Sequence, residues 1–233
     1  METAAFITGL RFLDSFFPSG GFAYSSGLEA AVQGGLVKNA DELSRYVTDL
    51  FQNGIGRRDA VAVARAWDVQ ARGDKGNKGA AEAIEADWEL EAMKLGRESR
   101  LASRQMGRQV VRLAADQLAI SPIVQEFRAA VDRESTPGHL PIAMGLTLGA
   151  AGWDREMAIA GSLYQTAVGF VSAGLKLLPM GQRDGQRLLE QWTPVIERIS
   201  RSVRADQSFT SWTPVQDIYA MRHSRLESRL FRS

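Results

Sequence analysis

Apolar residues recur along most of the chain at the three- and four-residue spacing of amphipathic α-helices. The clearest stripe comprises Leu43, Tyr46, Val47, Leu50 and Phe51. The positions between them are largely polar, which predicts a helix with one buried and one solvated face. Asn39 or Asp41 precedes the stripe, and either side chain could cap the helix.

A second stripe predicts a helix between Arg97 and Leu118. Its apolar members are Leu101, Met106, Val110, Leu113, Ala114 and Leu118. Arginines are spread around them, so we interpret this segment as a buried stripe beneath a solvated basic face.

Two glycine-rich segments keep helical spacing in the second half, "PIAMGLTLGAAGW" and "AIAGSLYQTAVGFVSAGLKLLP". An interior glycine costs about 1 kcal/mol relative to alanine, so close backbone packing must offset that cost. Gly145 and Gly149 are four residues apart and share one face. We therefore expect the two segments to form a buried helix pair that crosses at short range, with the gaps filled by Tyr164, Phe170 and Trp153.

Two breaks interrupt the helical pattern. "RGDKGNKG", residues 72–79, combines glycine with charge and has no apolar anchor, so we expect an exposed, mobile loop. "DRESTPGHLP", residues 132–141, contains two prolines and a glycine that end one helix and begin the next. No alternating strand of useful length is evident. The sequence predicts an all-α fold, a single-domain compact bundle of roughly ten helices over residues 1–233.

Composition narrows the classes of function. The chain has 28 basic and 27 acidic residues and a net charge of +1, so no overall field attracts nucleic acid or an anionic membrane. The absence of cysteine excludes disulfides, thiolate metal sites and a cysteine nucleophile, and it favours a cytoplasmic location. The first residues lack the regions of a signal peptide. Residues 157–175 carry no charge, but their content of small and polar residues disfavours a membrane-spanning helix.

Common catalytic and ligand-binding motifs are not evident. "GGFAYSSGLE" lacks the spacing and the lysine of a phosphate-binding loop, and no Gly-x-Ser-x-Gly elbow is present. His139 and His223 are the two histidines, and neither has a metal-binding spacing, so we expect no metal and no cofactor. His139 more plausibly braces the helix that follows it. Either Ser25 or Ser26 could accept hydrogen bonds from the first turn of a helix, and Ser26 and Glu29 have the spacing of a capping box.

The segment "DSFFPSGGFAYSSGLEAAVQ", residues 14–33, predicts a tight corner between two helices. Phe16 and Phe17 end the first helix in this interpretation, because Pro18 cannot continue it. Ser26 then starts the second helix.

The middle of this corner combines flexible backbone with aromatic side chains. Gly20 and Gly21 permit backbone angles that are closed to other residues. Phe22 and Tyr24 lie beside them, where aromatic side chains suit either partner recognition or core packing.

The C-terminal segment, residues 217–233, interleaves basic and apolar residues. These are Arg222, Arg225, Arg229 and Arg232 with Ile218, Leu226, Leu230 and Phe231. A terminus frays unless something holds it, so apolar residues this near the end predict a docking surface. That surface is either the protein's own core or another chain, for which arginine and aromatic anchors are favoured.

Three separated signatures resemble the urease accessory proteins of the UreF type. They are "FPSGGFAYSSGLEAAV", "LPMGQRDGQRLL" at residues 178–189, and the terminal "MRHSRLESRLFRS". Weaker agreement runs through "ESRLASRQMGRQVVRLA" and "GHLPIAMGLTLGAAG", so the likeness spans nearly the whole chain in order.

The resemblance implies an all-helical, non-enzymatic protein that helps to assemble the nickel centre of urease. The implied partners are an accessory scaffold protein of the UreD or UreH type, a nickel-delivering GTPase of the UreG type, and the urease apoprotein. It also implies a homodimer, and it gives no role to nucleic acid or membrane.

Carried over by position, the resemblance places partner binding in the corner and the C-terminal segment. The candidate residues are Pro18, Gly20, Gly21, Phe22, Tyr24, Arg225, Arg229, Leu230 and Phe231. The family often has histidine at the position of Tyr24, which argues against a metal at the corner of this chain.

Two alternatives remain open at this stage. One is a helical enzyme that uses Asp14, Glu29 or His139 as an acid or base, which requires these groups to converge in a pocket. The other is an adaptor that also modulates the GTP hydrolysis of its partner by inserting an arginine, with Arg225 and Arg229 as candidates.

Overall fold

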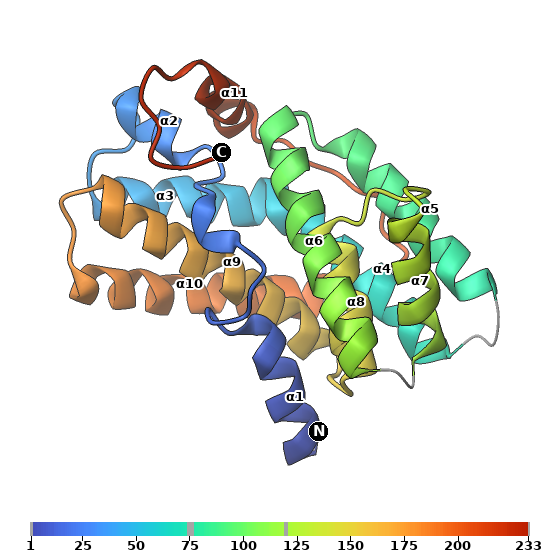
Figure 1. Cartoon of the computed structure of the whole chain (residues 1–233). Helices are drawn as coiled ribbons and strands as arrows, with labels where there is room; N and C mark the ends of the chain where they lie inside the picture. The colour runs from blue at the N-terminus through green and yellow to red at the C-terminus, as the bar shows by residue number, and fades with distance from the viewer. Residues whose placement is uncertain (1, 74–76, 119–120, 233) are drawn as a thin grey trace.

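A computed structural model describes residues 2–73, 77–118 and 121–232, and all regular structure in these ranges is helical. The helices are α1 (Thr3–Leu13), α2 (Leu28–Gln33), α3 (Ala40–Leu50), α4 (Asp59–Arg72), α5 (Asn77–Met93), α6 (Arg97–Gln117), α7 (Pro122–Asp132), α8 (Leu140–Ala150), α9 (Arg155–Leu177), α10 (Gln182–Ser202) and α11 (Pro214–Arg222). Three single turns complete the set, namely η1 (Gly21–Ala23), the π-helical η2 (Phe51–Ile55) and η3 (His223–Arg225). The predicted all-α fold is confirmed (Figure 1).

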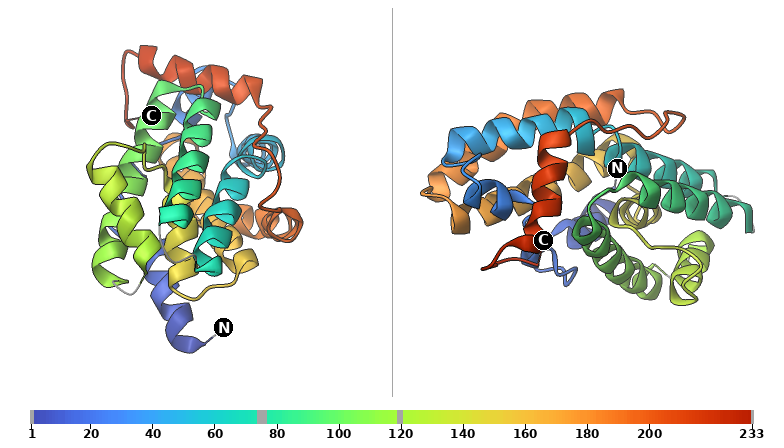
Figure 2. Two further views of the ribbon diagram at one scale, coloured as in Figure 1. Left: turned by 90° about the vertical axis from the view of Figure 1, so that its right-hand side faces the viewer. Right: turned by 90° about the horizontal axis from the view of Figure 1, so that it is seen from above.

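The helices pack in two groups that share α4, α8 and α9. α4 contacts α8, α5 and α9, and α6 covers another side of α8. α9 packs along α10, which in turn contacts α3. α2 and α11 lie together at one end of the molecule, whereas α1 extends from the opposite end (Figures 1 and 2).

The predicted amphipathic stripe of α3 is confirmed. Leu43, Tyr46, Val47 and Phe51 are buried, and Leu50 packs against the core from a half-buried position. Of the two candidate caps, Asn39 performs the role, because its side-chain oxygen accepts a hydrogen bond from the Glu42 N–H at 2.9 Å.

The glycines of α8 permit close packing, but their partner differs from the one expected. A Cβ atom on Gly145 would lie 2.4 Å from the Val63 carbonyl oxygen, so α8 crosses α4 rather than α9 at this point. Phe170 and Trp153 are buried as predicted, whereas Tyr164 is 49% exposed. The spacing of glycines identifies a close contact without identifying the helix on the other side.

The predicted stripe of α6 is partly wrong. Val110 and Ala114 are fully buried, but Leu101 is 50% exposed. The buried face passes instead through Gly107, where a Cβ atom would lie 2.3 Å from the Gly138 carbonyl oxygen. The loop before α8 therefore approaches α6 so closely at this position that only a residue without a side chain fits.

The loop predicted for residues 72–79 is shorter in the structure. α4 extends to Arg72, and α5 begins at Asn77, so both ends of the predicted loop are helical. Gly79 is buried, and a Cβ atom at this position would lie 3.1 Å from the Ile123 Cδ1 atom. Residues 74–76 lie outside the described part of the chain. The break between residues 132 and 141 is confirmed, since α7 ends at Asp132 and α8 begins at Leu140.

Within the described ranges, α9 is the one helix whose length and composition would allow it to cross a membrane. It packs against α10, α4 and α8 and contributes the buried Ile159, Leu163 and Phe170 to the core. The apolar content of α9 is accounted for by this packing, because a core helix needs the same residues.

Candidate functional site: the corner and the tail

The corner, defined here as residues 14–27, begins earlier than the sequence predicts. α1 ends at Leu13, and the Asp14 side chain accepts a hydrogen bond from the Phe16 N–H at 2.7 Å. The prediction that Phe16 and Phe17 end this helix is therefore wrong. An Asp side chain that captures a free backbone N–H turns the chain before Pro18 is reached.

The second half of the corner also differs from the prediction. Ser26 has a φ angle of 53°, and α2 starts at Leu28 after Gly27, whose φ angle is 83°. The proposed capping box is wrong, because Ser25 rather than Ser26 accepts a hydrogen bond from the Glu29 N–H, at 3.3 Å. The Glu29 side chain is consequently available for another role.

α11 lies directly on α2 because two glycines leave room for it. A Cβ atom on Gly27 would lie 2.8 Å from the Ala220 Cα atom, and one on Gly34 would lie 2.6 Å from the Tyr219 ring. The backbone of the C-terminal region therefore contacts the backbone of the corner. This contact joins segments that are nearly 200 residues apart in the sequence.

The chain that follows α11, called the tail here and comprising residues 223–232, is anchored on Glu29. This carboxylate is 2% exposed, and it accepts hydrogen bonds from the N–H groups of Leu230 at 2.6 Å and Phe231 at 3.1 Å. Farther along, the Arg232 N–H donates to the Ala23 carbonyl oxygen at 2.8 Å. Three backbone N–H groups of the tail thus find their acceptors on α2 and the corner.

His223 adds a second anchor and is fully buried. Its Nε2 atom lies 2.9 Å from Glu29 Oε2, and its Nδ1 atom lies 2.7 Å from Glu98 Oε2 on α6. Arg229 reaches the other oxygen of Glu98 at 3.1 Å. Tyr24 links the corner to the same helix, because its hydroxyl donates to Gln105 Oε1 at 2.6 Å.

These contacts decide the charge state of Glu29. Burial alone raises the pKa of a carboxyl group. Here the hydrogen bonds from Leu230, His223 and Phe231, together with the charge of the His223 ring, outweigh burial and hold the pKa of Glu29 below its usual value. Glu29 is therefore ionised when the tail is docked.

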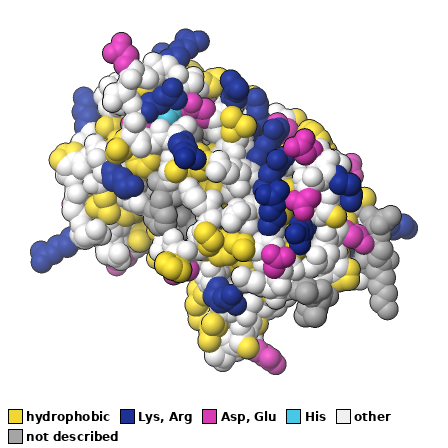
Figure 3. Space-filling view, in the orientation of Figure 1, with side chains coloured by type: hydrophobic (Ala, Val, Ile, Leu, Met, Phe, Trp, Pro, Cys, Tyr) yellow, Lys and Arg dark blue, Asp and Glu magenta, His cyan; other side chains and the backbone are white. Residues whose placement is uncertain are grey.

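The structure brings the predicted site residues of the two segments together on one face. Pro18 and Gly20 are exposed, and so are Arg225, Arg229 and Leu230. Figure 3 shows basic side chains over the docked tail and α6, with apolar and acidic groups between them. Phe22 is placed only through its backbone in η1, and its side chain lies outside the described part of the chain.

The position of Phe231 shows which surface the tail docks on. It is 6% exposed, it joins the hydrophobic core, and the Lys176 ammonium lies 5.2 Å from its ring centroid. The surface that holds Phe231 is therefore the protein's own core. Leu230, by contrast, is 63% exposed beside it.

Sequence reasoning missed a row of apolar side chains that leads to this face. Trp212 is 79% exposed, and Val215, Ile218 and Met221 on α11 are each close to half exposed. Their three-residue spacing marks one side of a helix, a signal that was available in the sequence. α11 lies at the top edge of the molecule in the left-hand view of Figure 2 and faces the viewer in the view from above.

A hollow of about 140 Å³ lies beneath the corner. Its lining includes Asp14, Tyr24 and Ser26 of the corner, together with Met106 of α6 and Phe170 of α9. Glu29 and His139 are not among its lining residues.

The structure separates the three groups of the enzyme hypothesis. Asp14 closes α1, Glu29 holds the tail, and His139 bonds to Glu91 at 2.8 Å in a third network. The three groups therefore share neither a hydrogen-bond network nor the hollow beneath the corner.

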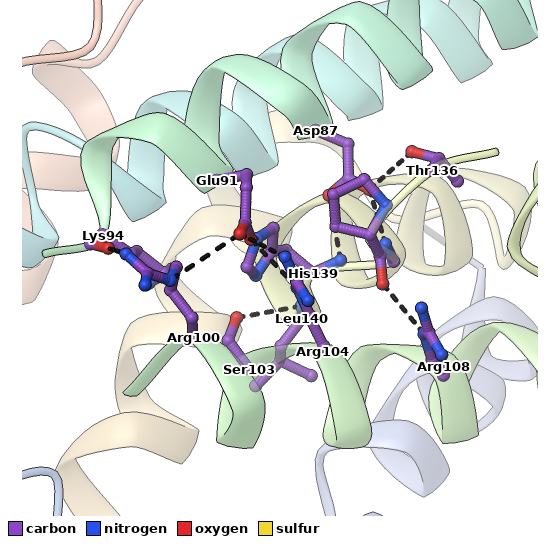
Figure 4. Close-up of polar contacts among 12 residues, drawn as sticks. Asp87, Glu91, Lys94, Arg100, Ser103, Arg104, Arg108, Thr136, His139 and Leu140 are labelled. Carbon is purple, nitrogen blue, oxygen red and sulfur yellow. Dashed lines mark hydrogen bonds and ion pairs between the residues drawn. The ribbon is translucent and has the colours of Figure 1, made fainter. Parts of the chain in front are cut away.

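The network around His139 fixes the loop that precedes α8 (Figure 4). Asp87 on α5 accepts hydrogen bonds from Thr136 Oγ1 at 2.7 Å, the Gly138 N–H at 2.6 Å and the His139 N–H at 2.9 Å. Burial, helped by the nearby Lys94 ammonium, lowers the pKa of His139 to about 4 against the opposing effect of Glu91. The ring is therefore neutral and braces this loop.

No group of three or more His, Cys, Asp or Glu side chains in the described ranges is arranged to hold a metal ion. The two histidines belong to separate networks, each directed at carboxylates within the protein. The corner and the tail present exposed apolar and basic side chains at the surface of the protein.

Comparison with known proteins agrees with this picture. The UreF family model matches residues 37–193. The urease accessory protein UreF of Actinobacillus pleuropneumoniae serotype 3 (strain JL03) is 34% identical over 227 residues, covering 96% of this chain and 97% of that protein. The urease accessory protein UreF of Haemophilus influenzae (strain ATCC 51907 / DSM 11121 / KW20 / Rd) is 30% identical over 227 residues, covering 96% and 94%.

The Bacillus sp. (strain TB-90) urease accessory protein UreF is 26% identical over 222 residues, covering 94% of this chain and 95% of that protein. Similarity thus extends along nearly the full length in each case. The chain belongs to the UreF family of urease accessory proteins.

Proposed function

We propose that the corner and the tail form one protein-binding surface with which this chain acts as an adaptor in urease maturation. The surface binds an accessory scaffold protein of the UreD or UreH type. The resulting complex recruits a nickel-delivering GTPase of the UreG type to the urease apoprotein. The observation that carries the proposal is the docking of the tail on Glu29, which unites two segments from opposite ends of the sequence.

The exposed side chains of this surface support a protein partner. Trp212, Met221 and Leu230 expose apolar area, and Arg225 and Arg229 are exposed on the tail. Tryptophan and arginine are the residues most enriched among the energetic centres of protein interfaces. A basic rim around apolar anchors is suited to an acidic, partly apolar partner surface.

Further parts of the proposal follow from family membership. The chain acts as a single domain in the cytoplasm, as a homodimer within the complex, and it catalyses no reaction itself. Nickel is the cargo of the assembly, delivered by the GTPase, and the chain needs no cofactor of its own.

Surface substitutions test the adaptor role better than deletion of the tail. Removing residues 226–233 would leave the buried Glu29 without two of its donors, so loss of binding and loss of folding would coincide. Leu230→Asp and Met221→Asp change exposed side chains instead. Ile7→Asp is a matched control, because Ile7 is 54% exposed on α1 at the far end of the molecule.

We expect both tail-side variants to fold and to lose co-elution with the purified scaffold protein, while Ile7→Asp still co-elutes. Continued co-elution of Leu230→Asp and Met221→Asp at wild-type levels would remove the tail from the interface.

A specific observation favours Arg225 over Arg229 as the arginine that modulates GTP hydrolysis. Arg229 is held by Glu98, whereas Arg225 is exposed and makes no hydrogen bond or ion pair within the described residues. We expect Arg225→Ala to leave the assembled complex intact and to slow the hydrolysis of GTP by the partner, with Arg225→Lys recovering little. An unchanged hydrolysis rate in the intact complex would leave Arg225 with a docking role only.

A further inference from the structure

The tail is held by a group of four charged side chains that we call the histidine lock: Glu29, Glu98, His223 and Arg229. Glu29 reaches the imidazole ring from α2, and Glu98 reaches it from α6. Arg229 contacts Glu98 from the tail itself. Arg222 and Arg225 flank His223 along the chain, but the Arg222 guanidinium lies over the Tyr219 ring. The ring is fully buried among these groups.

The geometry of the lock requires one specific protonation state. A carboxylate only accepts hydrogen bonds, and a neutral imidazole has one donor nitrogen and one acceptor nitrogen. In this structure both ring nitrogens face a carboxylate oxygen, at 2.9 Å and 2.7 Å. A neutral ring would place a lone pair against one of those oxygens. Both contacts are satisfied together only when the lock holds one additional proton.

The charges of the lock balance in this state. The two carboxylates are matched by one imidazolium and one guanidinium, so the lock is neutral as a whole. Loss of the proton would leave an uncompensated negative charge in a buried position, which is unfavourable. The N–H groups of Leu230 and Phe231 would then remain as the donors to Glu29.

We propose that His223 is a proton-dependent lock on the partner-binding surface, which holds the tail on the corner while the ring is charged and releases it when the proton is lost. The proposal rests on the proposed function for its biological meaning, because the released tail would no longer present Arg225, Arg229 and Leu230 beside the corner. Assembly of the accessory complex would therefore weaken as the pH is raised.

Glu98 offers a way to remove the proton requirement while keeping the hydrogen bond. In Glu98→Gln, the side-chain amide can donate to Nδ1 of a neutral ring, while Nε2–H still donates to Glu29. The variant therefore separates a lock that depends on the proton from one that depends on packing alone. His139→Gln is the matched control, because His139 is also fully buried but belongs to the Glu91 network.

The test measures the free full-length chain, so it does not depend on any partner. The ¹⁵N chemical shifts of the His223 ring report its charge, and amide hydrogen exchange of Leu230 and Phe231, corrected for the intrinsic rate, reports docking. We expect an imidazolium ring at about pH 6 in the wild type, with protection of the two amides falling at least about tenfold by about pH 9. His139→Gln should show the same profile, and Glu98→Gln should keep its protection at the higher pH.

A neutral His223 ring at about pH 6 with both amides protected would overturn the proposal. So would equal protection of the wild type at the two pH values, or a Glu98→Gln profile that falls as the wild type does. Failure of the proposed function would look different. The lock would behave as described in the free protein, while the purified scaffold protein failed to bind at about pH 6, where the tail is docked.

Discussion

The two histidines of this chain are both fully buried, but they differ in the number of carboxylates that contact the ring. His139 has one nitrogen on Glu91, the other nitrogen has no hydrogen-bond partner within the described residues, and burial keeps the ring neutral. His223 has a carboxylate on each nitrogen. The number of carboxylates that reach the ring, rather than burial itself, separates the two cases.

This difference matches what each network holds in place. The His139 network connects α5, α6 and the loop before α8, which are neighbours in the helical core. The His223 network joins the two ends of the chain, and its partners come from α2, α6 and the tail. A charged, fully paired group is suited to a contact that must be specific in position, whereas a neutral ring is suited to permanent packing.

The largest expected effect is the loss of the shared acceptor of the tail. Glu29→Ala removes the partner of two backbone N–H groups and of a charged ring, so we expect the free energy of unfolding to fall by about 3–5 kcal/mol. Denaturant unfolding measures it. Glu190→Ala, at an exposed position of α10, is the control and should stay within about 0.5 kcal/mol of the wild type. A similar small change for both variants would mean that the tail is not held by Glu29.

The second effect concerns the pH dependence of the His139 region. The pKa of His139 is about 4 in the folded protein and near its ordinary value of about 6.5 in the unfolded chain. Between these values the unfolded chain binds a proton that the folded protein does not, so stability falls as the pH is lowered from about 6.5 to about 4. The contribution is roughly 3 kcal/mol at most.

Unfolding curves of the wild type and His139→Gln across this pH range measure that contribution. The variant should show a shallower loss of stability than the wild type. Parallel curves would show that His139 is charged in the folded protein, and the contrast with His223 would disappear.

A smaller effect is expected for Asp87→Asn. The carboxylate accepts three hydrogen bonds at the loop before α8, and burial raises the pKa of Asp87 against them. An amide in its place turns an NH₂ group toward those donors, so we expect a loss of about 1–3 kcal/mol. Thermal unfolding measures the loss, and amide exchange of the tail should stay unchanged. Increased exchange at Leu230 would instead show that the two networks are coupled.

The smallest effect on stability is expected for Arg229→Ala. The Arg229 side chain is 42% exposed, and its pair with Glu98 is partly solvated, so the free energy of unfolding should fall by no more than about 1 kcal/mol. The affinity for the scaffold protein should fall more than the stability does. A variant that loses several kcal/mol of stability and no affinity would make Arg229 a structural residue.

Local features of the fold could be predicted from the sequence. The stripe of α3 and its Asn39 cap depend on residues within a few positions of one another, and they are confirmed. Helix ends near the corner were predicted less well, because Asp14 and Ser25 compete for the same backbone donors as Pro18 and Ser26. Short-range spacing does not decide between such neighbours.

Long-range contacts could not be predicted in this way. Gly145 indicated a close crossing, yet nothing in its spacing identified α4 as the partner. Glu29 has the spacing of a capping residue, but its side chain bonds to residues about 200 positions away. The candidate site was predicted as two segments. The roles of Glu29 and Glu98 in joining them were not predicted, because their partners are far away in the sequence.

Hydrogen-exchange mapping of the complex with the purified scaffold protein tests the central claim most directly. We expect segments covering residues 16–24 and 212–232 to gain protection together when the scaffold protein binds, while the exposed face of α1 around Ile7 does not change. Protection confined to other parts of the molecule, with the corner and the tail exchanging as they do in the free protein, would contradict the account.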